Sequence, residues 1–414
     1  MNILWVSHFS PYPPKGGAYQ RSYNMIRGLA KTCSVDLVTL ISRPVVMGFY
    51  SSYSEGYADI TSSLRGIVDS AEFVEIGKNS RLNSKLINAA KSLFSLRTYD
   101  EILYSSLRFA KSINAKVSEK KYDAIYVDTI SLMPLVAKVQ VPIILNHHNI
   151  ESDMLRLRVK SSLKLIAPYL YWEALKMKLL EKKYISKVSI NLTCSKIDSE
   201  KLSKVSDSAV IAEIPNGVDT SYFKRIEKYD SKIVEGLIFV GGLGWYPNAD
   251  AMKWFSSEIY PVIETVVSEV NVNIVGRGQV AELNKLAKKK PNVKLHGFVD
   301  DVRAYIEKSA IYICPIRDGG GTKLKILDAL AMGAPLVAHS KSCEGIDVVD
   351  GKHVLMADTP SDFANKVKKL IDNPILRQHL SENGIKLIEE KYSYHKIDKL
   401  FYQSIKKAIG EKNY

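Results

Sequence analysis

The sequence predicts an α/β protein with two consecutive domains, each a doubly wound parallel sheet covered by helices. From residue 3 to about residue 210, short apolar runs that are typical of buried parallel strands alternate with helical patterns. Residues 214–235 then change to turn signals and mixed charges, which is typical of an interdomain connection. The alternation restarts at residues 236–240 and continues over a region of similar size. We therefore expect domains over residues 1–212 and 213–391 that face each other across a cleft.

Composition narrows the class of protein. The chain has 414 residues, enough for two or three domains with their own cores, and a net charge of +14, which favours acidic ligands, anionic lipid or nucleic acid. Its four cysteines are far apart and form no CxxC, so we expect a reduced cytosolic protein without a cysteine metal site. The chain enters a strand at once, which leaves no room for a signal peptide, and it has no apolar run of about 18 residues. The predicted location is cytoplasmic, with the inner face of the cytoplasmic membrane as an option.

The chain begins with a predicted βα unit. A strand over residues 3–7 leads into the loop SPYPPKGG at residues 10–17, and an amphipathic helix follows over residues 18–31. The first loop of such a unit is the usual place for a ligand in an open parallel sheet. Gly16 and Gly17 could bring backbone N–H groups against a phosphate there. Because the pattern is not GxGxxG, a dinucleotide site has only weak support.

Another strand of the first domain ends in two histidines. Residues 142–146 run directly into His147 and His148, and the carboxyl ends of strands face the ligand crevice in a doubly wound sheet. Histidine can hydrogen-bond sugar hydroxyls or act as a general base, but adjacent residues of a strand point to opposite faces. The pattern favours one functional histidine over two that merely close the strand. Further strands are expected over residues 35–41, 73–76, 124–127 and 189–194.

Two segments combine basic and apolar residues at helical spacing, residues 81–121 and 156–187. Amphipathic basic helices can lie on an anionic bilayer surface. The same pattern is also typical of the solvated face of a packed helix. The sequence leaves both interpretations open.

The second domain repeats the strand and helix alternation. We expect the C-terminal segment 392–414 to pack back on the first domain, with an amphipathic helix over residues 392–407. Within the second domain, strands are expected over residues 236–240, 272–275 and 293–296, and helices over residues 249–265, 280–290 and 298–309.

The stretch 309–340 reads as strand, glycine loop, helix, turn and strand. Gly319, Gly320 and Gly321 end the strand and let the backbone approach another group closely. Thr322 is the predicted N-cap of the helix, and Gly333 fits the position just after its end.

The start of this helix carries unexpected charge. A capping box would place Glu three residues after Thr322, but Lys325 stands there, with Lys323 nearby. Two cations oppose the positive end of the helix dipole. A bound phosphate would be favoured by the backbone N–H groups, the dipole and both lysines. Two solvated surface lysines are the alternative.

Several short motifs occur in a fixed order along essentially the whole chain. They are Gly16-Gly17, HNIE at residues 148–151, Cys194-Ser195, PNGVD at 215–219, FVGGLGWYPN at 239–248, VGRG at 275–278, HGF at 296–298 and residues 319–333. Together they resemble the retaining GT-B glycosyltransferases of family GT4, and within that family a bacterial branch that makes surface polysaccharides. The resemblance implies two facing Rossmann-like domains, with a nucleotide-sugar donor held mainly by the second and an acceptor held mainly by the first.

The family's carboxylate pair carries over in part. Asp328 matches the second carboxylate, which implies hydrogen bonds to the donor ribose, although a pair with Lys325 could coexist. The first carboxylate would fall at Gly320, so its task is expected to pass to Asp318 or to the backbone N–H groups of residues 319–322.

The family's basic pair is also absent at its usual place, where Gly242 and its neighbours stand. Lys323 and Lys325 are therefore the candidates for the diphosphate, with Arg277 in support. His148 matches the active-site histidine. The predicted catalytic residues are His148, Lys323 and Asp318, and the predicted donor-binding residues are Gly16, Gly17, Gly242, Arg277, Phe298, Gly319, Gly320, Gly321, Thr322, Lys325 and Asp328.

The resemblance implies transfer of a sugar from a nucleoside diphosphate sugar to an acceptor hydroxyl with retention of configuration. The acceptor would be a glycan or lipid-linked glycan, with peripheral contact to an anionic membrane as an option. We expect no cofactor and no metal, since the sequence has no Asp-x-Asp and no ligand cluster. The alternatives are a nucleotide-sugar 2-epimerase of the same architecture and, with less support, a nucleic-acid-binding protein, for which an aromatic platform is missing. Nucleic acid is therefore not an expected partner.

Overall fold

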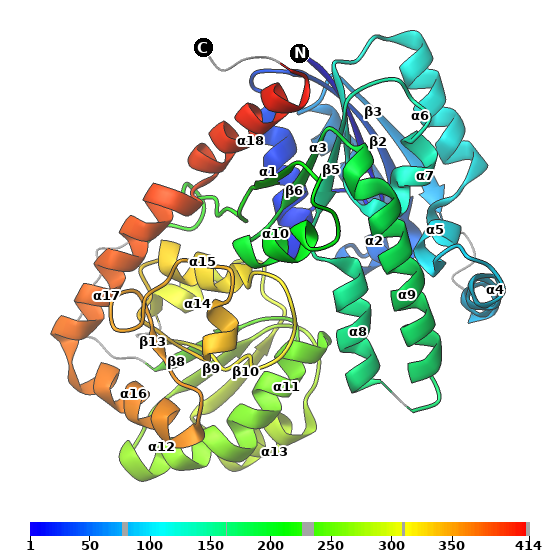
Figure 1. The fold of residues 1–414 in the computed structure, drawn as a ribbon. Helices are drawn as coiled ribbons and strands as arrows, with labels where there is room; N and C mark the ends of the chain where they lie inside the picture. The colour runs from blue at the N-terminus through cyan, green and yellow to red at the C-terminus, as the bar shows by residue number, and fades with distance from the viewer. Residues whose placement is uncertain (77–81, 163, 226–235, 309–310, 411–414) are drawn as a thin grey trace. The chain divides into compact units, whose positions relative to one another are not determined.

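A computed structural model describes residues 1–76, 82–162, 164–225, 236–308 and 311–410 of the chain (Figure 1). It divides into two compact units. The first comprises Met1–Pro215 and Ile397–Tyr414, and the second comprises Asn216–Lys396. Among the described residues, no helix is long and apolar enough to cross a membrane.

The first unit contains a seven-stranded sheet in the order β3-β2-β1-β4-β5-β6-β7, with all neighbours parallel. The strand order reverses between β1 and β4, so the carboxyl ends of these strands form a topological switch point where ligands bind in such folds. The strands are β1 (Asn2–Ser7), β2 (Ser34–Ser42), β3 (Ser70–Ile76), β4 (Ala124–Val127), β5 (Ile143–His147), β6 (Ile190–Thr193) and β7 (Ile211–Glu213).

Helices connect these strands, and some of them begin with a side-chain cap. Before α5, Thr98 and Glu101 form a reciprocal capping box, because each side chain accepts from the other's backbone N–H. The helices are α1 (Gly17–Leu29), α2 (Arg43–Phe49), α3 (Tyr53–Arg65), α4 (Leu82–Leu93), α5 (Tyr99–Tyr104), α6 (Leu107–Glu119), α7 (Met133–Val136), α8 (Glu151–Ser161), α9 (Ala167–Tyr184), α10 (Lys196–Ser203) and α18 (Tyr394–Ala408).

The C-terminal helix α18 packs on the first unit's core. The rings of Trp5 and Tyr126 stack with centroids 3.6 Å apart, and Phe401 of α18 lies edge-on to both at 6.1 and 5.7 Å. A Cβ at Gly28 of α1 would lie 2.1 Å from Oδ1 of Asp398, so a larger residue there would displace the Asp398 side chain of α18.

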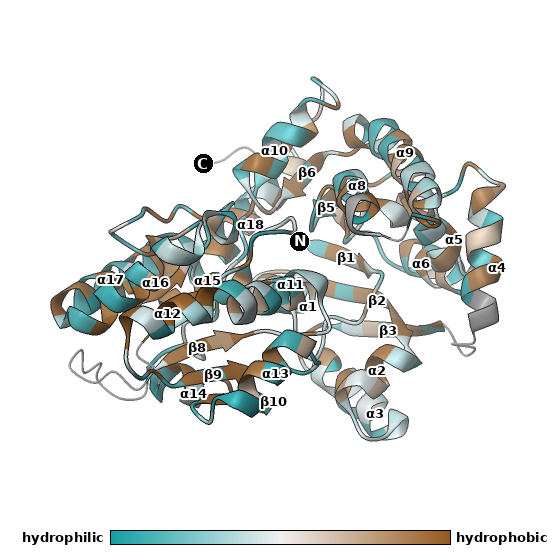
Figure 2. Ribbon diagram, turned by 90° about the horizontal axis from the view of Figure 1, so that it is seen from below, coloured by the Kyte–Doolittle hydropathy of each residue, from teal (hydrophilic) through white to brown (hydrophobic). Residues whose placement is uncertain are grey.

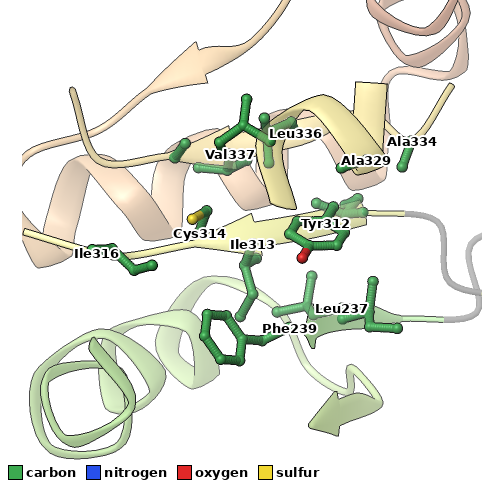
Figure 3. Packing of buried hydrophobic residues seen from close by; sticks show 14 of the residues in the cluster. Leu237, Phe239, Tyr312, Ile313, Cys314, Ile316, Ala329, Ala334, Leu336 and Val337 are labelled. Atoms are coloured by element: carbon green, nitrogen blue, oxygen red, sulfur yellow. The ribbon is translucent and has the colours of Figure 1, made fainter. Parts of the chain in front are cut away.

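The second unit contains a six-stranded parallel sheet in the order β10-β9-β8-β11-β12-β13. Its order reverses between β8 and β11, which places the switch point between these strands. Strands β8 and β9 are hydrophobic (Figure 2), and Figure 3 shows Phe239 of β8, Ile313 of β11 and Val337 of β12 in one buried cluster. The strands are β8 (Leu237–Val240), β9 (Val272–Val275), β10 (Val293–Gly297), β11 (Ile311–Cys314), β12 (Leu336–Ala338) and β13 (Leu355–Met356).

Two helices of the second unit differ from the prediction. The helix expected over residues 249–265 begins at Tyr246 and is divided by a π-helical turn over Phe255–Ile259, because Pro261 has no N–H to continue the ladder. The helix expected over residues 298–309 begins only at Arg303. The helices are α11 (Tyr246–Trp254), α12 (Tyr260–Val266), α13 (Ala281–Lys289), α14 (Arg303–Lys308), α15 (Leu324–Ala331), α16 (Pro360–Asp372) and α17 (Pro374–Leu387). The predicted fold class, two doubly wound parallel-sheet α/β domains, is confirmed.

Candidate functional site

The loops after β8 and β9 pack backbone against backbone. A Cβ at Gly276, whose φ is +150°, would lie 2.0 Å from the carbonyl oxygen of Gly241, and a Cβ at Gly278 would lie 2.6 Å from the nitrogen of Gly244. The backbone N–H of Leu243 donates to the carbonyl of Arg277 at 2.7 Å. The glycines of GGLG and VGRG therefore hold the two loops together at the carboxyl edge of the sheet. Gly242 lies within this contact, and its carbonyl accepts from the side chain of Asn248 at 2.8 Å.

The glycine loop before α15 packs against the start of α11. Gly319 has a φ of +96°, and a Cβ there would lie 2.8 Å from Cγ of Pro247. The carboxylate of Asp318 accepts from the backbone N–H of Gly319 at 2.7 Å. Asp318 thus stabilises the conformation of its own loop, and Gly320 and Gly321 continue it toward the helix.

Lys323 closes this loop onto itself. Its Nζ donates to the carbonyl oxygens of Gly319, Gly320 and Gly321 at 2.9, 2.8 and 2.9 Å. Burial of the ammonium group lowers the pKa of Lys323. Lys323 is therefore not the solvated surface lysine that the sequence left as an alternative.

The predicted N-cap is wrong. Helix α15 begins at Leu324, one residue later than an N-cap at Thr322 predicts, and Lys323 holds the N-cap position without a side-chain cap bond. The backbone of Lys323 itself is extended, with φ of −86° and ψ of 93°. The hydroxyl oxygen of Thr322 is buried and has no hydrogen-bond partner among the residues that the structure describes.

The side chain of Lys325 extends toward the loop that follows β8. Its Nζ donates to Oδ1 of Asn248 at 2.7 Å and lies 4.4 Å from the centre of the Phe239 ring. Burial lowers the pKa of Lys325 to about 8; the positive charge of Lys323 acts in the same direction, and the carboxylate of Asp328 opposes it. Asp328, one turn further along α15, is half-buried. The predicted pair between Lys325 and Asp328 is thus a Coulombic contact, while the hydrogen bond of Lys325 goes to Asn248.

Replacing Gly241 with alanine is expected to displace Lys325, because a Cβ at Gly241 would lie only 2.4 Å from Nζ. We expect an approximately tenfold loss of nucleoside diphosphate affinity, measured by isothermal titration calorimetry, in a protein that remains folded by circular dichroism. The matched control is Gly244→Ala in the same loop, where an added Cβ meets nothing within 4 Å. Equal affinities of the two variants would contradict the prediction.

Two further predicted residues of the second unit lie side by side at its surface. The guanidinium carbon of Arg277 lies 5.0 Å from the centre of the Phe298 ring, and both side chains are exposed. The structure therefore brings together Gly242, Lys325 and Arg277 through the paired glycine loops, with the residues 318–323 beside Pro247 of α11. The sequence analysis assigned no role to Asn248 or Pro247, although both belong to the motif at residues 239–248.

The predicted residues of the first unit lie at the carboxyl edge of its own sheet. Nε2 of His148 lies 3.0 Å from Oδ1 of Asp128, which directly follows β4 and is fully buried. Asp128 also accepts from the hydroxyls of Ser7 and Ser22 at 3.0 and 3.1 Å. Burial alone would raise the pKa of Asp128, but the contacts with His148 and His8 outweigh it and hold that pKa well below its ordinary value.

The two adjacent histidines have different environments. His147 is buried and lies 3.1 Å from Oδ1 of Asn191, and burial lowers its pKa to about 4. It is therefore neutral at physiological pH, which suits a structural role. Of the two adjacent histidines, His148 is the one that contacts Asp128, and its functional role stays a prediction.

His8 is a neighbour that the sequence analysis missed. Its Nδ1 lies 3.5 Å from Oδ2 of Asp128, and its ring centroid lies 5.2 Å from that of Tyr104 and 6.4 Å from that of His148. The position of His8 directly after the first strand was the sequence signal that could have identified it.

Burial raises the pKa of the half-buried Glu151 to about 7, and the negative charge of Asp100 adds to the shift.

Gly16 and Gly17 lie at the start of α1 in the same unit. Gly16 has a φ of +129° and is the N-cap residue, and Gly17 is the first residue of the helix. These glycines and His148 belong to the first unit, whereas the other predicted site residues belong to the second. Among the described residues, no group of three or more His, Cys, Asp or Glu side chains could hold a metal ion.

Comparison with known proteins shows what the second unit is similar to. Residues 235–373 match the family described as "Glycosyl transferases group 1". An uncharacterized 44.6 kDa protein in the cps region of Klebsiella pneumoniae is 22% identical over 236 residues, which cover 55% of this chain and 59% of that protein. An uncharacterized glycosyltransferase of Methanocaldococcus jannaschii is 30% identical over 194 residues, which cover 44% of this chain and 47% of that protein. The chain spans about half the length of the curated relatives that it matches.

Solved structures extend the likeness to the whole chain. Sucrose-phosphate synthase from Thermosynechococcus elongatus superposes with a TM-score of 0.72 at 12% identity and 100% coverage of both chains. HepE of Anabaena, solved with UDP and glucose, gives a TM-score of 0.63 at 14% identity, with 98% of this chain and 99% of that chain covered. TarM of S. aureus, solved with UDP and glycans, gives 0.66 at 13% identity, with coverages of 98% and 100%. The chain therefore has the GT-B fold of two Rossmann-like domains.

Proposed function

We propose that this protein is a retaining glycosyltransferase that moves a sugar from a nucleoside diphosphate sugar to an acceptor hydroxyl. The observation that carries the proposal is the position of two lysines at the glycine loops of the second unit. Lys325 lies beside the loop that follows β8, and Lys323 lies inside the loop before α15. The match of residues 235–373 to group 1 glycosyltransferases supports it independently.

The chemistry follows from where charge develops. When the bond between the sugar and the diphosphate breaks, negative charge grows on the leaving phosphate, and preorganised cations and N–H groups stabilise it. Lys325 and Arg277 would stabilise this negative charge from neighbouring elements of the second unit. Lys323 would form hydrogen bonds to phosphate oxygens in place of its three backbone carbonyl acceptors. Asp328 would accept from the ribose hydroxyls of the donor.

The first unit would supply the acceptor side. Because Nε2 of His148 faces Asp128, its Nδ1 is the nitrogen left to meet a sugar or acceptor hydroxyl. The contact with the buried carboxylate of Asp128 would fix the orientation of the His148 ring. A surface polysaccharide or lipid-linked glycan is the acceptor class we propose, in keeping with the relative in a cps region and with the glycan complexes of TarM.

A screen of UDP-, GDP- and dTDP-sugars tests the proposal. A ligand at about 100 times its dissociation constant stabilises the folded state by about 2.7 kcal/mol, which corresponds to a Tm increase of several degrees in a protein of this size. We expect one nucleotide class to produce that shift and to support sugar transfer to a glycan acceptor. Failure of all three classes to raise Tm would overturn the proposal.

The alternative is a nucleotide-sugar 2-epimerase, which would use the same phosphate contacts. Glu151 and the two histidines near Asp128 provide the titratable groups that such an acid–base reaction needs. Product analysis with and without an acceptor distinguishes the two: an epimerase changes the nucleotide sugar alone, whereas a transferase requires the acceptor.

The affinity for the selected nucleoside diphosphate is expected to decline as the pH rises above about 8. The pKa of Lys325 is lowered to about 8, so the free protein loses this positive charge above that pH, and the diphosphate binds the charged form. The decline should approach tenfold per pH unit until the pKa of the complex is reached. Calorimetric titrations across this range should give a flatter profile for Lys325→Met. The same slope in both proteins would contradict the assignment.

A further inference from the structure

The first unit exposes a large apolar surface at the ends of α4, α8 and α9. Leu165 is 95% exposed, Phe94 88% and Leu96 80%, although apolar side chains of this size are usually covered. We call this region the apolar–basic surface. Its apolar members are Leu86, Ile87, Leu93, Phe94, Leu96, Leu165, Ile166, Tyr171, Trp172 and Leu179.

A buried polar network holds the pieces of this surface together. The hydroxyl of Ser92, at the end of α4, lies 2.8 Å from that of Tyr169 on α9 and donates to Glu173 at 2.7 Å. Nζ of Lys176 donates to the carbonyls of Ser92 and Arg97 at 2.6 and 2.9 Å. The segment between α4 and α5 is therefore fixed on α9, so the apolar side chains that it carries are presented on an ordered support.

Helix α9 differs from the predicted amphipathic pattern, because both of its sides are apolar. Met177 and Leu180 are buried against the unit, while Tyr171, Trp172 and Leu179 are exposed. A helix with apolar residues on both sides needs a second apolar environment for its outer side.

The charges of the apolar–basic surface have one sign. Both carboxylates of α9 are turned inward: Glu173 accepts from Ser92, and Glu181 accepts from the hydroxyl and N–H of Ser152 at 2.6 and 3.0 Å. Residues 82–97 contain no acidic residue. The exposed charged residues of residues 85–97 and 164–183 are Lys85, Lys91, Arg97, Lys164, Lys178, Lys182 and Lys183.

We propose that the apolar–basic surface docks this protein on an anionic lipid bilayer. Exposed Leu, Ile and Phe side chains would enter the boundary of the acyl chains, and Trp and Tyr suit the interface because they are apolar with a polar edge. The surrounding lysines and arginines are attracted by the negative surface potential. A second copy of the chain fits less well, since a symmetric contact would bring cations against cations. This docking goes beyond the proposed transfer reaction and would deliver a lipid-linked acceptor to it.

Vesicle co-sedimentation of the full chain tests the proposal without any nucleotide sugar. We expect at least tenfold stronger binding to phosphatidylcholine vesicles that contain about one third phosphatidylglycerol than to pure phosphatidylcholine vesicles, and weaker binding at high salt. Phe94→Ser with Leu96→Ser, and separately Lys178→Glu with Lys182→Glu, should each lower this binding tenfold or more at unchanged Tm. The matched control is Ile375→Ser in the second unit, where the side chain is equally exposed at 80%.

The outcomes separate this inference from the transfer reaction. Equal binding of both vesicle types, or anionic binding that neither double variant lowers, would overturn the docking. A concentration-dependent dimer that Phe94→Ser with Leu96→Ser dissociates would replace the membrane with a second copy as the occupant. In either case transfer to a water-soluble acceptor, measured on the same variants, remains the test of the proposed function.

Discussion

Replacing Lys323 with alanine and Lys325 with methionine together is expected to lower kcat by about 10³-fold or more. Removing a single preorganised donor from a site of developing negative charge typically costs 10²–10³-fold, and this variant removes two cations from the proposed diphosphate site. Steady-state transfer from the donor selected by the screen is the measurement, with kcat and KM determined separately.

A change of surface charge alone should leave that rate intact. Lys253→Ala removes a 60% exposed lysine from the same unit, where its Nζ lies 3.6 Å from Glu282, and it should keep the wild-type kcat. Circular dichroism and Tm show whether the double variant is folded, because methionine retains the packing of the Lys325 stem. A wild-type rate in the folded double variant would remove both lysines from the assignment.

Replacing Asp128 with asparagine is expected to lower kcat by 10²-fold or more with a smaller change in KM. Asparagine keeps the shape of the side chain but loses the negative charge that His148, His8 and two serine hydroxyls face. The imidazole of His148 then loses the carboxylate partner that fixes its orientation and its tautomer. The pH dependence of kcat should shift together with the rate.

Two comparisons make this result specific. Asp36→Asn replaces another buried carboxylate of the same unit, which accepts from Lys120 and Tyr122 at 2.8 and 2.9 Å, and should lower Tm without changing kcat. If Asp128 acts through His148, adding His148→Ala to Asp128→Asn should cost little beyond the larger single effect. Strictly additive losses would contradict that coupling.

The sequence was sufficient for the fold because buried parallel strands leave a local signal. The apolar runs that became β1 and β8 are typical of strands covered on both faces. The end of α15 was predictable for the same local reason. Gly333 adopts a φ of +61°, its N–H donates to Leu330, and the N–H of Ala334 donates to Ala329, both at 2.9 Å.

The features that the sequence analysis missed depend on contacts between distant segments. Asp128 meets His148 because β4 and β5 are neighbours, and His8 joins them because β1 pairs with β4. The start of α15 was predicted too early because capping preferences favour Thr322 locally, whereas the three loop carbonyls that bind Lys323 are visible only in the fold. Long-range geometry of this kind has no signature in residue spacing.

The ammonium group of Lys323 has three carbonyl oxygen acceptors within its own loop. A ligand that binds Lys323 must therefore replace three hydrogen bonds to backbone carbonyls. A pyrophosphate can do so through charge-assisted hydrogen bonds, whereas an uncharged nucleoside cannot form them. Inhibitors without an anionic group should leave the hydrogen bonds of Lys323 to its own loop unchanged. The affinity of an inhibitor is therefore expected to increase with the negative charge that it places beside Lys323.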